Sequence, residues 1–471
     1  MKQALFLTLT FLTTTAGLFA QTPTEPPKTH QLTVQEAVAI ALKQRVEILN
    51  AQLDIKNQAA YNGEITGTAL PQIKGMVNVT DYFSIPTTVL PDFISPSVYG
   101  ILNQEGVKDG NGQTIQVPTN ISTFPAQFGT PWQASVGLNI QQLLFQPDVF
   151  MGLKVRGTAL ELYENQLKIQ EDTVKSSVYR AYYGVLIAEK GLSFAKESET
   201  RLQKLYDDQG QMFKNGFIER LDLDKTQVSL NNIHTTVLQL QNLVSMGYAG
   251  LKFALALPQQ DQLVLTDTLS NDQIRRDVFT LAEDFKYENR SEIQTLQTTD
   301  KLLAFDVRRH KLNALPTLAA NYNLSTNAQR QRFSFFDTND RWFVSNYLGI
   351  GMNVPIFDGN QRHNRVKQAQ YALEKNRNTL ALAKQGIDLQ LVASRSQLTN
   401  AISALNVQEE NKKLAESVYS TTKTKYERGL GSSFELLQTE ASLQDALNNY
   451  YQALYNAIIA KITYVKALGK L

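Results

Sequence analysis

The chain has 471 residues, a formal net charge of +2, a hydrophobic content of 42% and no cysteine. The near-neutral charge argues against a dedicated nucleic-acid-binding protein, which would carry a basic surface. The lack of cysteine excludes a disulfide framework and also excludes a lipoprotein anchor, which needs a cysteine to carry the lipid. Beyond the N-terminus no apolar run reaches about 18 residues, so the sequence predicts no membrane-spanning helix.

Residues 1–20 have the pattern of an export signal. Lys2 supplies the positive charge, and an apolar stretch follows as far as Ala20. Cleavage after Ala20 would leave Gln21 as the first residue. An exported protein without a spanning helix or a lipid is either released or held in an outer membrane as a barrel.

The sequence contains an internal repeat. The stretch KNGFIERLDLDKTQVSL, which begins at Lys214, aligns with ERGLGSSFELLQTEASL, which begins at Glu427. The offset is 213 residues, the separation of Gly216 and Gly429. We therefore expect a first structural repeat at 21–257, a linker at 258–276 and a second repeat at 277–471.

Each repeat should contain a helix, two strands, a long helix and a shorter helix. The long helices are expected at 148–209 and 360–428 and the shorter ones at 218–257 and 432–468, because few glycines or prolines interrupt them. Apolar residues recur every seven positions in both long segments, as in a coiled coil: Leu153, Leu160, Leu167 and Val174, then Val366, Leu373, Leu380 and Ile387. At about 1.5 Å per residue each long helix would measure roughly 90–100 Å. A compact globule does not need such a rod, although an ordinary helical bundle stays an alternative.

Four strands are expected, at 70–83, 132–145, 316–327 and 343–357. Apolar and polar residues alternate along each, so one face of the strand is apolar and the other is polar. Their lengths suit a tilted membrane strand, which needs roughly 9–11 residues. Trp132 and Trp342 precede or open the second strand of each pair, which is typical of aromatic residues at a membrane interface. Burial of the tryptophans in a protein core is the alternative.

Four strands cannot close a barrel, because spanning barrels start at about eight strands. An open sheet in lipid would leave backbone groups without hydrogen-bond partners. Either the sheet is soluble, or several chains combine their strands, with the apolar face toward lipid and the polar face toward a water-filled lumen. The connection between the first two strands is long and rich in proline and glycine, and we expect it to face outward.

Several segments together resemble the TolC family of outer-membrane efflux channels. They are LTVQEAVAIALKQRVEI near the start, ALP before the first strand of each pair, VPIFDGNQRHNRVKQAQ at Val354–Gln370, YERGLGSSFELLQTEASL and the closing VKALGKL. The resemblance implies a mainly α-helical fold with a small β part. Three chains would share a 12-stranded outer-membrane barrel and an α-helical periplasmic tunnel.

The resemblance also implies partners: a homotrimer, outer-membrane lipid, a periplasmic adaptor (membrane fusion protein) and an inner-membrane transporter. No cofactor, metal or nucleic acid is expected. The tips of the helical hairpins, with Gly216, Gly429, Leu430 and Ser432, would dock the adaptor. By resemblance, acidic residues just past the tip ring the closed aperture, and the matching positions here are Glu435, Gln438 and, in the first repeat, Asp222. Gln438 departs from the acidic pattern, and ordinary helix-surface polarity is the alternative for all three.

The expected function is therefore passive export of small molecules through an outer-membrane channel. Protein secretion by a type I system is one alternative, and a soluble periplasmic coiled-coil scaffold is another. An enzyme is not expected, because the four histidines are scattered and the sequence has no HExxH motif, P-loop or nucleophile elbow.

Overall fold

The computed structural model describes residues 28–120, 122–269, 285–337 and 339–471. The predicted export signal at 1–20, the last part of the predicted linker and the residues 277–284 lie outside this part of the chain. The chain divides into two compact units. The helical unit comprises Met1–Ile55, Tyr163–Gln297 and Thr379–Leu471, and the sheet unit comprises Lys56–Leu162 and Thr298–Asn378. Both units therefore take segments from both halves of the sequence.

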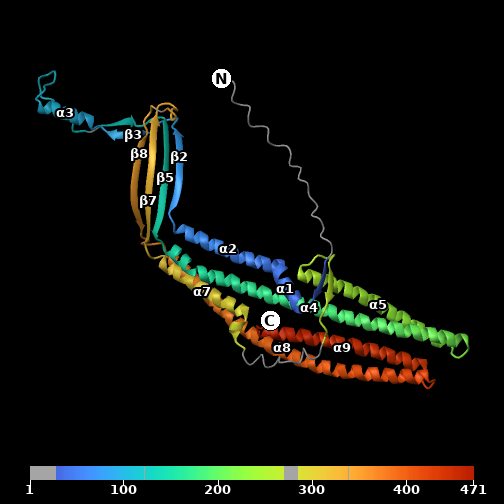
Figure 1. The fold of residues 1–471 in the computed structure, drawn as a ribbon. Helices are drawn as coiled ribbons and strands as arrows, with labels where there is room; N and C mark the ends of the chain where they lie inside the picture. Colours follow the sequence, from blue (N-terminus) through green and yellow to red (C-terminus); the bar gives the residue numbers. More distant parts are fainter. Residues whose placement is uncertain (1–27, 121, 270–284, 338) are drawn as a thin grey trace, which may run out of the picture. The chain divides into compact units, whose positions relative to one another are not determined.

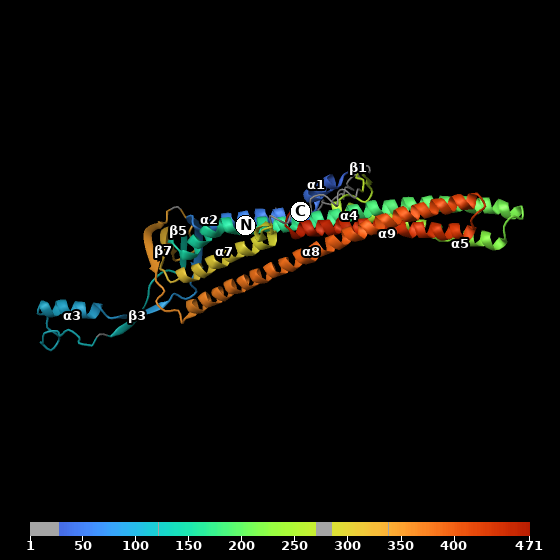
Figure 2. The same ribbon diagram turned by 90° about the horizontal axis from the view of Figure 1, so that it is seen from below.

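Two helical hairpins dominate the fold (Figures 1 and 2). Helix α4 (Pro147–Lys214, 68 residues) is followed by α5 (Arg220–Leu255, 36 residues). Helix α8 (Gln361–Glu427, 67 residues) is followed by α9 (Ser433–Ala467, 35 residues). The predicted fold class of long helical hairpins with four strands is confirmed. Among the described residues, no helix combines the length and the apolar composition needed to cross a membrane.

The core of the helical unit gathers α1 (Val34–Gln44), α4 and α5. Thr33 caps α1 in a reciprocal pair with Glu36, which satisfies backbone donors at the helix start. The fully buried Tyr182 of α4 donates a hydrogen bond to the Leu32 carbonyl (2.8 Å). The start of the chain's described part is thus tied to the long helix.

A short parallel ribbon, which the sequence did not suggest, joins the start of the predicted first repeat to the predicted linker. β1 (Thr29–Leu32) pairs with β6 (Gln262–Leu265). The His30 ring lies 3.0 Å from a carboxylate oxygen of Asp261, and the Lys28 amide donates to the other oxygen at 3.2 Å. The hydrogen bonds from His30 and from the Lys28 amide keep the pKa of Asp261 below its usual range.

The sheet unit holds a four-stranded antiparallel sheet in the order β2-β5-β7-β8 (Figure 1). The strands are Gln72–Asp81 (β2), Trp132–Phe145 (β5), Thr317–Arg330 (β7) and Phe343–Asn353 (β8). β8 stops before Val354-Pro355, since proline cannot donate to a strand ladder. β7 continues to Arg330, which pairs with Trp132.

The connection between β2 and β5 is more ordered than a simple loop. It contains a β-hairpin of β3 (Thr87–Pro91) and β4 (Thr123–Gln127) with α3 (Ile94–Gln104) between them. Pro91 and Pro125 lie within these short strands, and proline argues against a strand in the sequence. The other helices in the described part of the chain are α2 (Val46–Thr68), the 3₁₀ turn η2 (Tyr287–Asn289) and α7 (Ser291–Leu312).

Candidate functional site

The tips of the two helical hairpins have the same backbone turn. Gly216 and Gly429 adopt φ values of 75° and 74°, in the left-handed region that glycine populates readily. A Cβ at either position would meet nothing within 4 Å, so the backbone conformation alone requires glycine. The residue after each glycine, Phe217 or Leu430, is 77% exposed. Each tip therefore presents one large apolar side chain; Phe217 was not among the predicted tip residues, although the 213-residue offset relates it to Leu430.

Glu435 and Ser432 form the start of α9. The Glu435 amide donates to the Ser432 hydroxyl (3.2 Å), and the Ser432 amide donates to the Glu435 carboxylate (3.4 Å). This reciprocal cap satisfies two backbone donors, and a carboxylate is also favoured at the positive end of the helix dipole. Glu435 thus has a local structural role in addition to the role predicted at the aperture.

The other two predicted gate residues also lie near the starts of the shorter helices, α5 and α9. Gln438 is exposed on α9, one turn beyond Glu435. Asp222 is half-buried on α5, with its carboxylate 3.8 Å from the Lys225 ammonium. The Lys225 ammonium lies 5.9 Å from the centre of the Phe434 ring, so the starts of α5 and α9 are neighbours. A ring of carboxylates about an axis would need more than one chain.

A buried ion pair, which sequence analysis missed, joins the two hairpins near their tips. Glu440 of α9 is buried, and it accepts hydrogen bonds from Arg201 (2.7 Å) and Ser198 (2.6 Å) of α4. The Arg201 guanidinium also lies 5.6 Å from the centre of the Tyr419 ring of α8. The pair could not be found from the sequence, because Arg201 and Glu440 are 239 residues apart and each resembles an ordinary helix-surface charge.

The pKa values around this pair follow from its burial and charge. Burial, reinforced by the nearby Glu440 carboxylate, raises the pKa of Tyr419 to about 12. Burial lowers the pKa of Arg201, but the hydrogen bonds and charge of Glu440 outweigh it, so the net shift is upward. The cluster therefore holds Arg201 charged and Tyr419 neutral at physiological pH.

A neutral hydrogen-bond chain lies closer to the tips. The fully buried Gln209 of α4 accepts from the Thr226 hydroxyl (2.6 Å) of α5 and donates to the Tyr426 hydroxyl (3.3 Å) of α8. Both hairpins thus share polar contacts whose loss would leave buried groups without partners.

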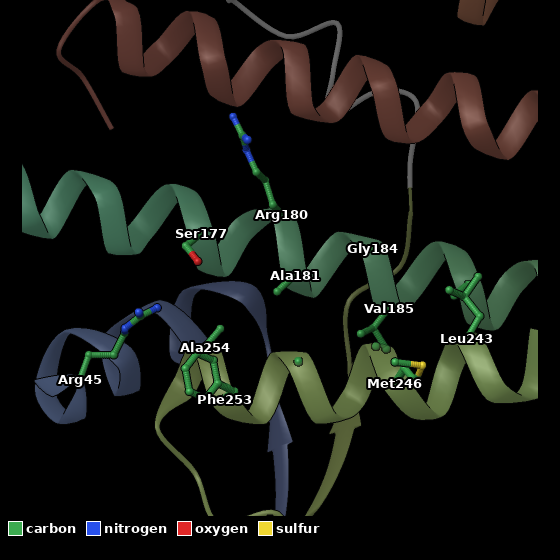
Figure 3. Close-up of a pocket in the computed structure, with 13 residues that line it drawn as sticks. Arg45, Ser177, Arg180, Ala181, Gly184, Val185, Leu243, Met246, Phe253 and Ala254 are labelled. Carbon is green, nitrogen blue, oxygen red and sulfur yellow. The ribbon is translucent and has the colours of Figure 1, made fainter. Parts of the chain in front are cut away.

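Grooves of different chemistry run along the two hairpins. The groove between α4 and α5 has a volume of about 530 Å³ and is mainly apolar, with Leu243, Met246 and Phe253 on α5 facing Ala181 and Val185 on α4 (Figure 3). The groove between α8 and α9, about 590 Å³, includes several residues exactly one repeat offset away, and its lining is rich in amides: Gln397, Asn400, Gln408, Asn449, Gln452 and Asn456. Neither groove combines acid, base and nucleophile groups among its lining residues.

The apolar face of the sheet extends over its four strands and is interrupted on β8 by Asn346, which pairs with Leu324. Val77 of β2 pairs with Val136 of β5, which pairs with Thr326 of β7, which pairs with Val344 of β8. Two residues farther along β5, Leu138 lies opposite Leu324 of β7. Two residues beyond that, Ile140 lies opposite Tyr322, which pairs with Leu348 of β8. Val77, Val344 and Leu348 are each about 70% exposed (71%, 71% and 69%). An exposed apolar surface of this size indicates contact with lipid or protein.

The two tryptophans lie together at one end of the sheet, in an aromatic cluster. The Trp132 ring is 5.0 Å from Phe333, and the Trp342 ring is 6.2 Å from the buried Phe335. Both are half-buried, so the single chain neither exposes them fully nor encloses them. Their predicted position at a membrane interface stays a prediction.

Comparison with known proteins identifies the chain. The sequence profile of the family described as "Outer membrane efflux protein" matches residues 304–470. TolC of Salmonella enteritidis, an outer membrane protein, is 22% identical over 344 residues, which cover 72% of this chain and 70% of TolC. The chain is similar to the TolC family of outer-membrane efflux proteins. This similarity confirms the resemblance inferred from the sequence and the predicted location in the outer membrane.

Two further proteins are similar to this chain, one in sequence and one in fold. The alkaline protease secretion protein AprF of Pseudomonas aeruginosa is 19% identical, over 69% of this chain and 67% of AprF. The outer membrane channel CmeC of Campylobacter jejuni superimposes with a TM-score of 0.70 at 14% identity, covering 93% of this chain and 85% of CmeC. These proteins are channels or secretion components, so the prediction that the chain is not an enzyme is confirmed.

Proposed function

We propose that this protein, which is similar to the TolC family, is the outer-membrane channel of a tripartite efflux system. It passively exports small molecules that an inner-membrane transporter delivers through a periplasmic adaptor. The observation that carries the proposal is the in-register apolar face on an open four-stranded sheet, joined in sequence to two helical hairpins of more than 100 residues each.

The edges of the sheet support assembly from several copies. Among the residues that the structure describes, β2 and β8 each pair with another strand on one side only. In lipid those backbone groups would be unsatisfied unless β8 of one copy paired with β2 of the next. Three copies would supply 12 strands, with the apolar face toward outer-membrane lipid, the polar face toward water and Trp132 and Trp342 at the interface.

The hairpin tips are the proposed docking surface for the adaptor. Phe217 and Leu430 are each 77% exposed, and Leu221 and Phe434, one turn along their helices, are 57% and 60% exposed. Apolar side chains at a tip favour a protein partner, and Gly216, Gly429 and the Ser432 cap fix the turns that present them. Replacement of Phe217 and Leu430 by serine should abolish adaptor binding while leaving the assembled channel intact.

Glu435 is proposed to control cations at the periplasmic aperture, with Asp222 and Gln438 nearby. Glu435→Gln removes the charge but keeps a side chain able to cap the helix, so it separates the two roles of this residue. We expect weaker block of bilayer conductance by divalent and trivalent cations in E435Q, and stronger block in Gln438→Glu, which adds a second acidic position. Unchanged block in both variants would remove these residues from the aperture.

Protein secretion is the second candidate function, because AprF is among the relatives. The two functions differ in which molecule stays inside cells whose copy of this gene is disrupted. If the protein exports small molecules, such cells should retain a fluorescent dye, and the wild-type gene should restore export of the dye. Normal dye export together with loss of a secreted protein would instead support type I secretion.

A further inference from the structure

The connection between β2 and β5, residues 84–131, leaves the sheet and returns to it at the same end. We call it the arm. Its base closes where the Tyr82 amide donates a hydrogen bond to the Pro131 carbonyl (2.7 Å), next to the paired strand ends Asp81 and Trp132. The opposite ends of β2 and β5 lead into α2 and α4. The arm and the predicted periplasmic helices are therefore attached to opposite ends of the strands.

Helix α3 of the arm turns its apolar side outward. Ile94, Val98 and Ile101 follow one another at helical spacings of four and three residues, so they lie on one side of the helix. They are 54%, 47% and 61% exposed. We call them the α3 stripe.

The side of α3 that contacts the rest of the arm is polar. Asn103 lies nine residues after Ile94, which is 2.5 helical turns, so the two side chains point to opposite sides. The Asn103 amide donates a hydrogen bond to the Ile115 carbonyl (2.6 Å). A helix in a water-exposed loop would instead place its apolar side against the loop and its amides toward water. The α3 stripe therefore needs an apolar environment from outside the arm.

Exposed apolar side chains also occur between α3 and the base of the arm. Phe83, directly after β2, is 98% exposed, and Phe128, directly after β4, is 67% exposed. Val89 of β3, which pairs with Pro125, is 64% exposed. The arm thus carries apolar side chains from the end of the sheet, whose apolar face is proposed to meet lipid, as far as α3.

The arm has few charges. In residues 84–131 only Asp92, Glu105, Lys108 and Asp109 are charged, and none of them lies within α3. The negative balance gives no attraction to anionic headgroups, so a contact with lipid would depend on burial of the α3 stripe. Neutral side chains such as Gln104 can stay among the headgroups while the stripe enters the acyl chains.

We propose that α3 lies on the outer leaflet of the outer membrane, with the α3 stripe among the acyl chains. A second copy is a less suitable occupant, because Pro91 of β3 and Pro125 of β4 cannot donate backbone hydrogen bonds to an added strand. The inference rests on the proposed lipid-facing sheet and adds a second contact with lipid, at the membrane surface.

Site-specific fluorescence tests this contact, because the natural chain has no cysteine and a single introduced cysteine can be labelled. Val98→Cys, labelled with an environment-sensitive fluorophore, is reconstituted as the full-length protein in phosphatidylcholine vesicles. The vesicles are made with and without bromine on the acyl chains near the headgroup. Bromine quenches only fluorophores that reach these chains, so the Val98→Cys probe should lose fluorescence in the brominated vesicles.

Gln104→Cys is the matched control on the same helix. Gln104 is exposed and lies six residues after Val98, which places it a third of a turn away around the helix. Its probe should keep its fluorescence. Serine at both Ile94 and Ile101 should remove the quenching of the Val98→Cys probe. Equal quenching at Val98 and Gln104, or quenching that survives the serine replacements, would overturn the contact between the stripe and the acyl chains.

Salt and oxidation distinguish lipid from other occupants. Quenching of the Val98→Cys probe should be the same at low and high salt, because the stripe carries no charge. Its disappearance at high salt would contradict an apolar contact. Unlabelled Val98→Cys should stay uncross-linked on oxidation, whereas covalent oligomers would assign the stripe to a second copy.

A probe at Val77→Cys, on the apolar face of the sheet, separates this inference from the proposed function. Both probes should be quenched. Quenching at Val77 without quenching at Val98 would overturn the arm contact and leave the lipid-facing sheet standing. Quenching at Val98 alone would support the arm contact and contradict the lipid-facing sheet, and quenching at neither position would overturn both.

Discussion

At the residue scale, buried polar contacts hold the two hairpins together. Glu440, Arg201 and Ser198 form the clearest example, because the carboxylate is buried and both donors lie within 2.7 Å. Removing the charge from a buried pair leaves its partner unsatisfied, which costs more than the pair itself contributes.

Glu440→Gln should therefore destabilise the helical unit by about 2 kcal/mol. The expected result is a clear fall in the melting temperature of the purified protein, followed by circular dichroism. Glu410→Gln, at an exposed position of α8, is the matched control and should change the melting temperature little. Equal shifts in the two variants would show that the Glu440 cluster is not a significant stabilising contact.

The tip glycines depend on backbone conformation rather than space. Gly429→Ala should cost about 1–2 kcal/mol, because φ is 74° and L-residues disfavour that region. Gly210→Ala, within helix α4 and with open space around its Cβ, should instead gain about 0.5–1 kcal/mol. Thermal unfolding of both variants measures whether Gly429→Ala lowers the stability and Gly210→Ala raises it. Loss of stability in both variants would contradict this explanation.

The Asp261 contact predicts a pH dependence. Its pKa is depressed in the folded protein, so its stabilising effect is present above the unfolded aspartate value of about 3.9 and is lost as the pH falls through the lower folded value. Asp261→Asn should lower the melting temperature at pH 6, and this difference should shrink below about pH 4. A difference that stayed constant from pH 6 to pH 3 would assign the effect to something other than the carboxylate charge.

At the element scale, the spacing of apolar residues predicted the long helices and strands, but it did not predict contacts between segments that are distant in the sequence. Long helices and alternating strands were found because their patterns repeat over many residues, as in Ala134, Val136, Leu138 and Ile140 of β5. The β1–β6 ribbon and the β3–β4 hairpin were missed, since four or five residues interrupted by loops or prolines carry little periodic signal. The ion pair of Arg201 and Glu440 depends on tertiary packing and leaves no local pattern.

The sheet offers a direct test of which face meets lipid. Val77→Lys places a charge on the apolar face and should cost about 2–4 kcal/mol near the bilayer centre, which would strongly reduce the amount of assembled protein in outer membranes. Asn78→Lys, the neighbouring residue on the polar face, should assemble normally. Immunoblots of membrane fractions measure both; equal loss in the two variants would contradict a lipid-facing apolar surface.

At the scale of the whole molecule, a single chain leaves its main surfaces incomplete. Within the described residues, the apolar sheet face, the outer sides of β2 and β8 and the apolar tips are all exposed in one copy. In the proposed channel, lipid would cover the first, neighbouring copies would cover the second and the adaptor would cover the third. The sequence indicated that more than one chain was needed, whereas three copies came from the resemblance alone.

Planar lipid bilayers provide the most direct test of the proposal that several copies form a water-filled channel. Purified protein extracted from outer membranes in detergent should insert and give discrete, uniform conductance steps, with the oligomer persisting in the same preparation. Protein that is monomeric in buffer without detergent, and that leaves the bilayer non-conducting, would contradict it.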